Sequence, residues 1–144
     1  MTRQPNVPRG RFPPQKRVRK RSEYQEIQAT ARRVSTSRFV LLLYARDDEK
    51  GARLGTIASR KVGIAVIRNR AKRLIREAFR ATQELWPADV DLVVVVKRPP
   101  GEARLRDVIG DWLEAKTAIE SRIREARSDR SLRASRAPGL AKPG

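Results

Sequence analysis

Arginines and lysines between residues 68 and 80 are the residues whose types and spacing best suit chemistry with a partner. At about 100° per residue, they gather on one side of a helix, with Asn69 in the middle of that side. The basic residues of this side are Lys72, Arg73, Arg76 and Arg80, with Arg68 and Arg70 at its N-terminal end. Like charges four positions apart repel each other by a few tenths of a kcal/mol. The spacing therefore indicates a negatively charged partner, a polyanion, that relieves the repulsion.

The apolar residues of the same segment form a separate side. They recur at the i, i+3, i+4 and i+7 positions typical of an amphipathic helix. The members are Ala71, Leu74, Ile75, Ala78, Phe79, Leu85 and Trp86. We predict a helix that begins between Ile64 and Arg68 and ends at about Trp86, because Pro87 disfavours a helical residue before it.

The charge balance of the whole chain agrees with a polyanionic partner. The 144 residues include 34 Lys and Arg against 16 Asp and Glu, which gives a net charge of +18 and a pI near 11.6. Such a balance indicates nucleic acid or another anionic surface. The lack of cysteine and histidine excludes Ser-His-Asp, Cys-His and His-zinc chemistry. No apolar run approaches the roughly 18 residues of a membrane helix, so we predict a cytoplasmic protein with no membrane partner.

Acidic residues offer one alternative chemistry. The densest cluster is Asp47-Asp48-Glu49, and carboxylates can bind Mg²⁺ for phosphodiester hydrolysis. Consecutive loop residues point in different directions, so we interpret this cluster as a charged loop next to Gly51. Asp89 and Asp91 flank the start of a predicted strand and are interpreted as edge or cap residues. The sequence therefore predicts no catalytic residue and no metal site made of protein.

One helix and two strands are predicted before the basic helix. Ser22 and Gln25 form a capping box that begins a short helix, which runs to about Ala31. The apolar runs at 38–45 and 54–59 are predicted strands, and we expect them to pair as a hairpin.

A strand and a helix are predicted after the basic helix. The β-branched run at 91–97 suits a strand buried on both faces, which makes strand, helix and strand a βαβ unit. A last helix is predicted over 102–124. Composition then divides the chain into a disordered, basic, proline-rich arm (1–21), a folded domain (22–124) and a disordered, arginine-rich tail (125–144).

The segment 59–79, which reads SRKVGIAVIRNRAKRLIREAF, is similar to a known signature. It resembles the bacterial ribonuclease P protein component, in which an Arg-Asn-Arg helix follows a strand end of the form Lys-x-Gly. The similarity extends from about Arg17 to Lys116. It implies an α/β two-layer sandwich, similar to domain 2 of ribosomal protein S5. In that fold a central, mainly antiparallel sheet of about four strands has a βαβ crossover that carries the basic helix.

The resemblance also implies a function. In this family the large RNA subunit is the ribozyme, which holds the catalytic Mg²⁺ ions and cuts precursor tRNA to leave the mature 5′ end. The protein is the non-catalytic, RNA-binding subunit, whose partners are the catalytic RNA and the 5′ leader of the substrate. The predicted RNA-binding residues are Arg60, Lys61, Arg68, Asn69, Arg70, Lys72, Arg73, Arg76 and Arg80.

In the family, a cleft between the first helix and the sheet holds the leader, partly through aromatic residues that stack on unpaired bases. Tyr24 and Phe39 are the residues of this chain that we predict for the cleft. Gln28 and Leu42 stand where relatives often have aromatic residues.

Two other functions explain a small basic domain. One is a ribosomal or ribosome-assembly protein that binds RNA. The other is general binding of nucleic acid or membrane through a basic amphipathic helix. The first predicts cosedimentation with a ribosomal subunit, and the second predicts that binding depends on net charge alone.

Overall fold

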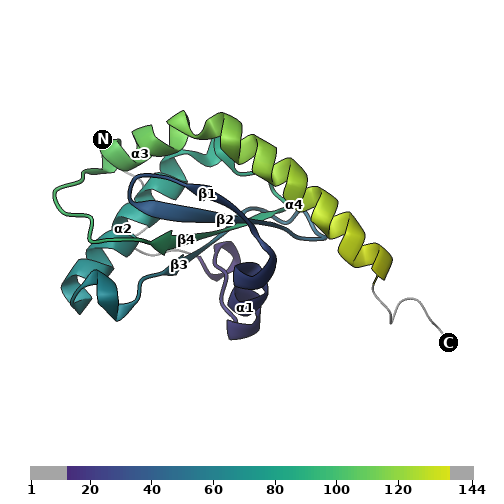
Figure 1. Cartoon of the computed structure of the whole chain (residues 1–144), viewed down its shortest axis with the longest axis horizontal. Helices are drawn as coiled ribbons and strands as arrows, with labels where there is room; N and C mark the ends of the chain where they lie inside the picture. Colours follow the sequence, from purple (N-terminus) through teal and green to yellow (C-terminus); the bar gives the residue numbers. More distant parts are fainter. Residues whose placement is uncertain (1–12, 137–144) are drawn as a thin grey trace.

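A computed structural model describes residues 13–136 and shows a four-stranded sheet with helices packed against it (Figure 1). The strands are β1 (Arg32–Ser35), β2 (Phe39–Ala45), β3 (Arg53–Ile57) and β4 (Val90–Val96). The helices are α1 (Arg21–Thr30), α2 (Ala65–Ala81), α3 (Leu105–Glu114) and α4 (Lys116–Arg136). The strand order is β1-β2-β4-β3, and every neighbouring pair is antiparallel except the parallel pair β3–β4. The predicted α/β fold with a mainly antiparallel sheet is confirmed.

The alternation of side chains along β2 divides the apolar core between the two faces of the sheet. Phe39, Leu41 and Leu43 lie in the core that the sheet forms with α2, α3 and α4. Leu42 and Tyr44 lie in a smaller cluster on the other face, against α1. β4 is buried almost throughout, as its β-branched run predicts.

The βαβ unit is confirmed, but the predicted hairpin is wrong. β3 and β4 are joined through α2 and pair in parallel, with Leu54 opposite Leu92. β2 and β3 do not pair, because β4 lies between them. The hairpin partner of β2 is β1, an edge strand that the sequence did not predict. Only Val34 of its four residues is buried, so β1 shows little apolar pattern.

α2 ends earlier than predicted, at Ala81. The buried hydroxyl of Thr82 donates to the carbonyl oxygen of Ala78 at 2.7 Å and accepts from Nε1 of Trp86 at 3.0 Å. A 3-10 turn, Gln83–Leu85, follows and keeps Trp86 in the core. Trp86 therefore reaches the core, as its helical spacing predicted, although the α-helix ends at Ala81.

The C-terminal helix continues further than predicted. The helix predicted over 102–124 is divided into α3 and α4 at Ala115, and α4 includes residues 125–136. The predicted disorder is therefore wrong for these residues. Three residues of α4 are buried: Ile119, Ile123 and Ala126. They pack α4 along the sheet and its edge strand (Figure 1). Residues 137–144, the rest of the predicted tail, lie outside the described residues.

Part of the predicted N-terminal arm is also ordered. Pro14–Lys16 form a 3-10 turn, and Val18 is buried at 4% exposure. The N–H of Val18 donates to the carbonyl oxygen of Leu54 on β3 at 3.0 Å. The domain therefore begins before the predicted boundary at 22. Residues 1–12, the rest of the predicted arm, lie outside the described residues.

Candidate nucleic-acid interface

α2 is anchored by its apolar side, as predicted, except that Leu74 is only half-buried and lies outside the core. Ala71, Ile75 and Ala78 have no exposed surface, and Phe79 is 4% exposed. Phe79 stacks on Trp86 with ring centroids 6.2 Å apart. Burial of this side fixes the rotation of the helix, so the opposite side must face outward.

The predicted RNA-binding residues lie on α2 and in the 3-10 turn before it (Arg60–Val62). We call these nine residues, from Arg60 to Arg80, the basic surface. Arg70 reaches the segment before α3, where its Nη1 atom is buried. Arg80 forms an ion pair with Glu77 at 3.0 Å. Within residues 13–136, no ion pair joins the other cations of this surface to a carboxylate. The surface therefore remains strongly positive.

Two arginines of the basic surface are held by backbone carbonyls. Nη1 of Arg68 donates to the oxygen of Gly63 at 2.9 Å, and Nη2 of Arg70 donates to the oxygen of Ala103 at 2.7 Å. A neutral acceptor fixes the position of a guanidinium without cancelling its charge. These two cations are therefore positioned before any partner binds.

Arg76 is half-buried, and its Nε atom is buried without a hydrogen-bond partner. Burial lowers the pKa of its guanidinium, and the nearby charges of Arg80 and Arg73 lower it further. A buried donor without an acceptor is unfavourable. A phosphate beside the exposed part of this side chain would offset the repulsion.

A pocket of about 410 Å³ lies beside Arg76, and we call it the basic pocket. Its lining residues come from the N-terminal segment, α1, β3 and α2: Arg17, Val18, Arg19, Tyr24, Leu54, Gly55, Thr56, Lys72 and Arg76. The lining includes four cations and no carboxylate. Tyr24 is half-buried, and burial raises the pKa of its phenol. One predicted cleft residue, Tyr24, therefore shares a pocket with two residues of the basic surface, Lys72 and Arg76.

The prediction that Phe39 lines the cleft is wrong. Phe39 is 1% exposed and lies in the core on the α2, α3 and α4 side of the sheet. Leu42 lies on the α1 side, and residues three apart on a strand face opposite ways. This alternation along the strand could have excluded Phe39 from the cleft on the basis of the sequence alone.

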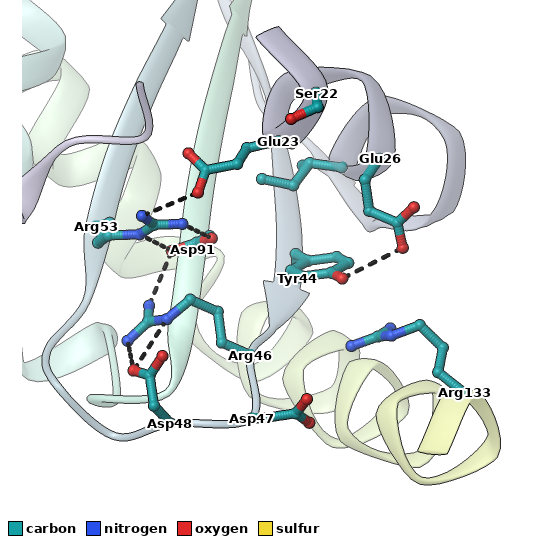
Figure 2. Close-up of a pocket in the computed structure, with 11 residues that line it drawn as sticks. Ser22, Glu23, Glu26, Tyr44, Arg46, Asp47, Asp48, Arg53, Asp91 and Arg133 are labelled. Atoms are coloured by element: carbon teal, nitrogen blue, oxygen red, sulfur yellow. Dashed lines mark hydrogen bonds and ion pairs between the residues drawn. The ribbon is translucent and has the colours of Figure 1, made fainter. Parts of the chain in front are cut away.

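A second cavity, of about 390 Å³, has a different electrostatic character (Figure 2). Arg46 is only 9% exposed and donates to Asp91 at 2.8 Å and to Asp48 at 2.7 Å. Arg53 donates to the other oxygen of Asp91 at 2.8 Å and pairs with Glu23 at 3.4 Å. Arg46 and Arg53 are thus neutralised by the protein itself, whereas Arg133, also in the lining, donates to the carbonyl oxygen of Ala45. The lining has five carboxylates against three arginines, so the cavity is a poor site for a polyanion.

In the acidic cluster considered for metal binding, Asp47-Asp48-Glu49, Asp48 forms an ion pair with Arg46. Hydrogen bonds from Arg46 and from the N–H of Lys50 hold the pKa of Asp48 at about 2. Asp89 and Asp91, interpreted as edge or cap residues, instead pair with arginines: Asp89 with Arg127 and Arg130, and Asp91 with Arg46 and Arg53. Between residues 13 and 136 no three possible ligands gather at one point. These carboxylates do not fit a Mg²⁺ site.

The described helices also include none with the length and apolar character that a bilayer-spanning helix requires.

The fold and the site define a small, strongly basic α/β protein whose cationic surface helix suits a nucleic acid. The chain belongs to the ribonuclease P protein family, because residues 12–117 match the family model described as "Ribonuclease P". The family predicted from the residues around Arg68 is thereby confirmed.

Relatives and solved structures agree with this family assignment. The ribonuclease P protein component of Desulfovibrio desulfuricans is 43% identical over 95 residues, which are 65% of this chain and 73% of the relative. That of Gluconacetobacter diazotrophicus is 35% identical over 96 residues, 66% of this chain and 83% of the relative. The structure of the Staphylococcus aureus RNase P protein is 27% identical, with a TM-score of 0.62 and coverage of 75% of this chain and 97% of that one. The Thermotoga maritima protein is 27% identical, with a TM-score of 0.61 and coverage of 68% and 92%.

Proposed function

We propose that this chain is the RNA-binding protein subunit of ribonuclease P and assists the catalytic RNA in removing the 5′ leader from precursor tRNA. The relatives are named as protein components of ribonuclease P, an enzyme of tRNA processing. The observation that carries the proposal is the basic surface, whose cations other than Arg80 lack carboxylate partners within the described chain. The protein contributes binding, and the RNA contributes the endonuclease chemistry.

The basic surface would bind the catalytic RNA through its phosphates. Each lysine or arginine that neutralises a phosphate releases counterions, which favours binding and makes it sensitive to salt. Arg68 and Arg70 are already held by carbonyls, so less conformational entropy is lost when they bind. This arrangement gives a fixed pattern of cations along one helix.

The leader of precursor tRNA would enter the basic pocket beside α1. An aromatic face that stacks on an unpaired base contributes about 1–3 kcal/mol. Tyr24 is the aromatic residue in the lining of this pocket, and Lys72 and Arg76 are within the same lining. A single-stranded RNA could therefore place a base on the ring and phosphates on the cations.

The proposal leaves the Mg²⁺ ions with the RNA subunit. The carboxylates of Asp48, Asp89 and Asp91 form ion pairs with arginines, and no three possible metal ligands gather at one point within residues 13–136. The protein would act by holding the RNA and the leader together, which lowers the Mg²⁺ concentration that the reaction needs. We place this reaction in the cytoplasm, where precursor tRNA is processed.

The test is cleavage of precursor tRNA by the cognate RNA at low Mg²⁺, with and without the protein. We expect the protein to stimulate release of the 5′ leader and the Arg73→Ala/Arg76→Ala variant to stimulate it less. Arg124→Ala is the control, because Arg124 is exposed on α4, away from the basic surface. Absence of stimulation by the unaltered protein would reject the proposal. Cosedimentation with a ribosomal subunit would favour a ribosomal protein instead.

A further inference from the structure

Gly55 occupies a position where the backbone does not require glycine. It lies in β3, opposite Val93 of β4, and its φ is outside the left-handed region. Glycine in the middle of a strand weakens it, because glycine loses more conformational freedom and offers no side chain to pack. The presence of glycine here must therefore be explained by the atoms that surround it.

Tyr24 fills the space that a side chain at position 55 would need. A Cβ atom on Gly55 would lie 2.8 Å from the phenol oxygen of Tyr24, 2.9 Å from Cε1 and 3.0 Å from Cζ. Distances below 3.0 Å require one of the groups to move. The ring of Tyr24 thus lies directly against the backbone of β3.

The position of this ring determines the shape of the basic pocket. Tyr24 and Gly55 both line the pocket, together with Lys72 and Arg76 of α2. If the ring were displaced from β3, it would move relative to those cations. The spacing between the ring and the cations would then differ from the one that a nucleotide meets in the unaltered pocket.

We infer that Gly55 is a positioning residue: its missing side chain lets Tyr24 lie against β3, where ring and cations form a single binding site for an unpaired nucleotide of the leader. This inference rests on the proposed function. It concerns the leader, because Gly55 acts through the ring of Tyr24, which is not a residue of the basic surface, although the pocket shares Lys72 and Arg76 with that surface.

The experiment measures the affinity of the reconstituted holoenzyme for precursor tRNA and for tRNA without a leader. The ratio of the two affinities isolates the leader contact. We expect Tyr24→Ala and Gly55→Ala each to reduce this ratio about tenfold, the size expected for one stacked base. The double variant Tyr24→Ala/Gly55→Ala should reduce it no further, because Gly55 acts through Tyr24. Gly110→Ala is the matched control, since a Cβ on Gly110 in α3 meets no atom within 4 Å.

Affinity for the catalytic RNA separates this inference from the proposed function. Gly55→Ala should bind that RNA as the unaltered protein does. An unaltered ratio in Gly55→Ala, or additive losses in the double variant, would overturn the role of Gly55 alone. Failure of Gly55→Ala to fold even with the RNA bound would also overturn it, because Gly55 would then serve packing only. If the unaltered holoenzyme shows no preference for the leader, the leader part of the proposed function fails first.

Discussion

At the scale of single residues, the arginines of this chain divide into two kinds. Arg46 and Arg53 share the carboxylate of Asp91, which is 1% exposed, so their charges are used inside the fold (Figure 2). Arg68 and Arg70 donate to neutral carbonyls and keep their charges for a partner. Residue type does not distinguish the two kinds, because the difference arises from acidic residues that are distant in the sequence.

The exposed arginine at the centre of the basic surface gives a test of direct phosphate contact. We expect Arg73→Ala to weaken binding to the catalytic RNA and to reduce the slope of log K against log salt by about one. The measurement is a salt titration of the affinity, with Arg124→Ala as the control. A slope equal to that of the unaltered protein would argue against a phosphate contact at Arg73.

The buried carboxylate gives a test of stability. Asp91→Ala should lower the free energy of unfolding by about 3 kcal/mol, because it removes the buried carboxylate that Arg46 and Arg53 share and leaves Asp48 as the remaining carboxylate partner of Arg46. Urea denaturation measures this difference. Asp111→Ala is the matched control, since Asp111 and its partner Arg38 are 28% and 26% exposed and a partly exposed pair contributes about 1 kcal/mol or less. Equal losses in the two variants would contradict the role assigned to Asp91.

At the scale of elements, a helix or strand could be predicted from the sequence when its own residues show the pattern typical of that structure. α2 and β4 could be predicted, because a two-sided helix and a continuous β-branched run are local signals. β1 could not, because a short edge strand with one buried residue takes its structure from β2. The C-terminal half of α4 could not either. Its arginine-rich sequence resembles a disordered tail until Arg127 and Arg130 pair with Asp89.

This pairing predicts how the attachment of α4 responds to acid. The hydrogen bond from Arg127 holds the pKa of Asp89 at about 2, against an ordinary value of 3.8. A carboxyl group whose pKa is lower in the folded state stabilises the fold above its unfolded pKa, and the stabilisation is lost as the pH falls through the folded pKa. Asp89→Asn should therefore be less stable than the unaltered protein above pH 3.8, and the difference should shrink as the pH falls to about 2. Thermal unfolding across this range measures it, and a difference independent of pH would contradict the assignment.

At the scale of the whole molecule, the net charge of +18 arises from cations in two different situations. One part of the surface pairs arginines with carboxylates, whereas the basic surface and the basic pocket leave their cations for a partner. Seven of the nine residues of the basic surface could be predicted from the helical spacing, because they follow one another on α2. The other two, Arg60 and Lys61 in the turn before it, were predicted from the family resemblance. The sequence alone did not predict the basic pocket, which brings Arg17, Tyr24 and Arg76 together from separate parts of the chain.

If the location of charge decides function, moving charges while keeping the total should weaken binding to the catalytic RNA. The variant Lys61→Ala/Arg73→Ala/Thr117→Arg/Ala134→Arg removes two cations from the basic surface and adds two at exposed positions of α4. Its net charge stays at +18, so general attraction to RNA is preserved. We expect weaker binding to the catalytic RNA, by about tenfold or more for two lost phosphate contacts, and little stimulation of leader cleavage. Affinities measured at one salt concentration, beside an unrelated RNA of equal length, test this expectation. Equal binding of the catalytic RNA by the variant and the unaltered protein would show that net charge, and not the geometry of α2, drives the interaction.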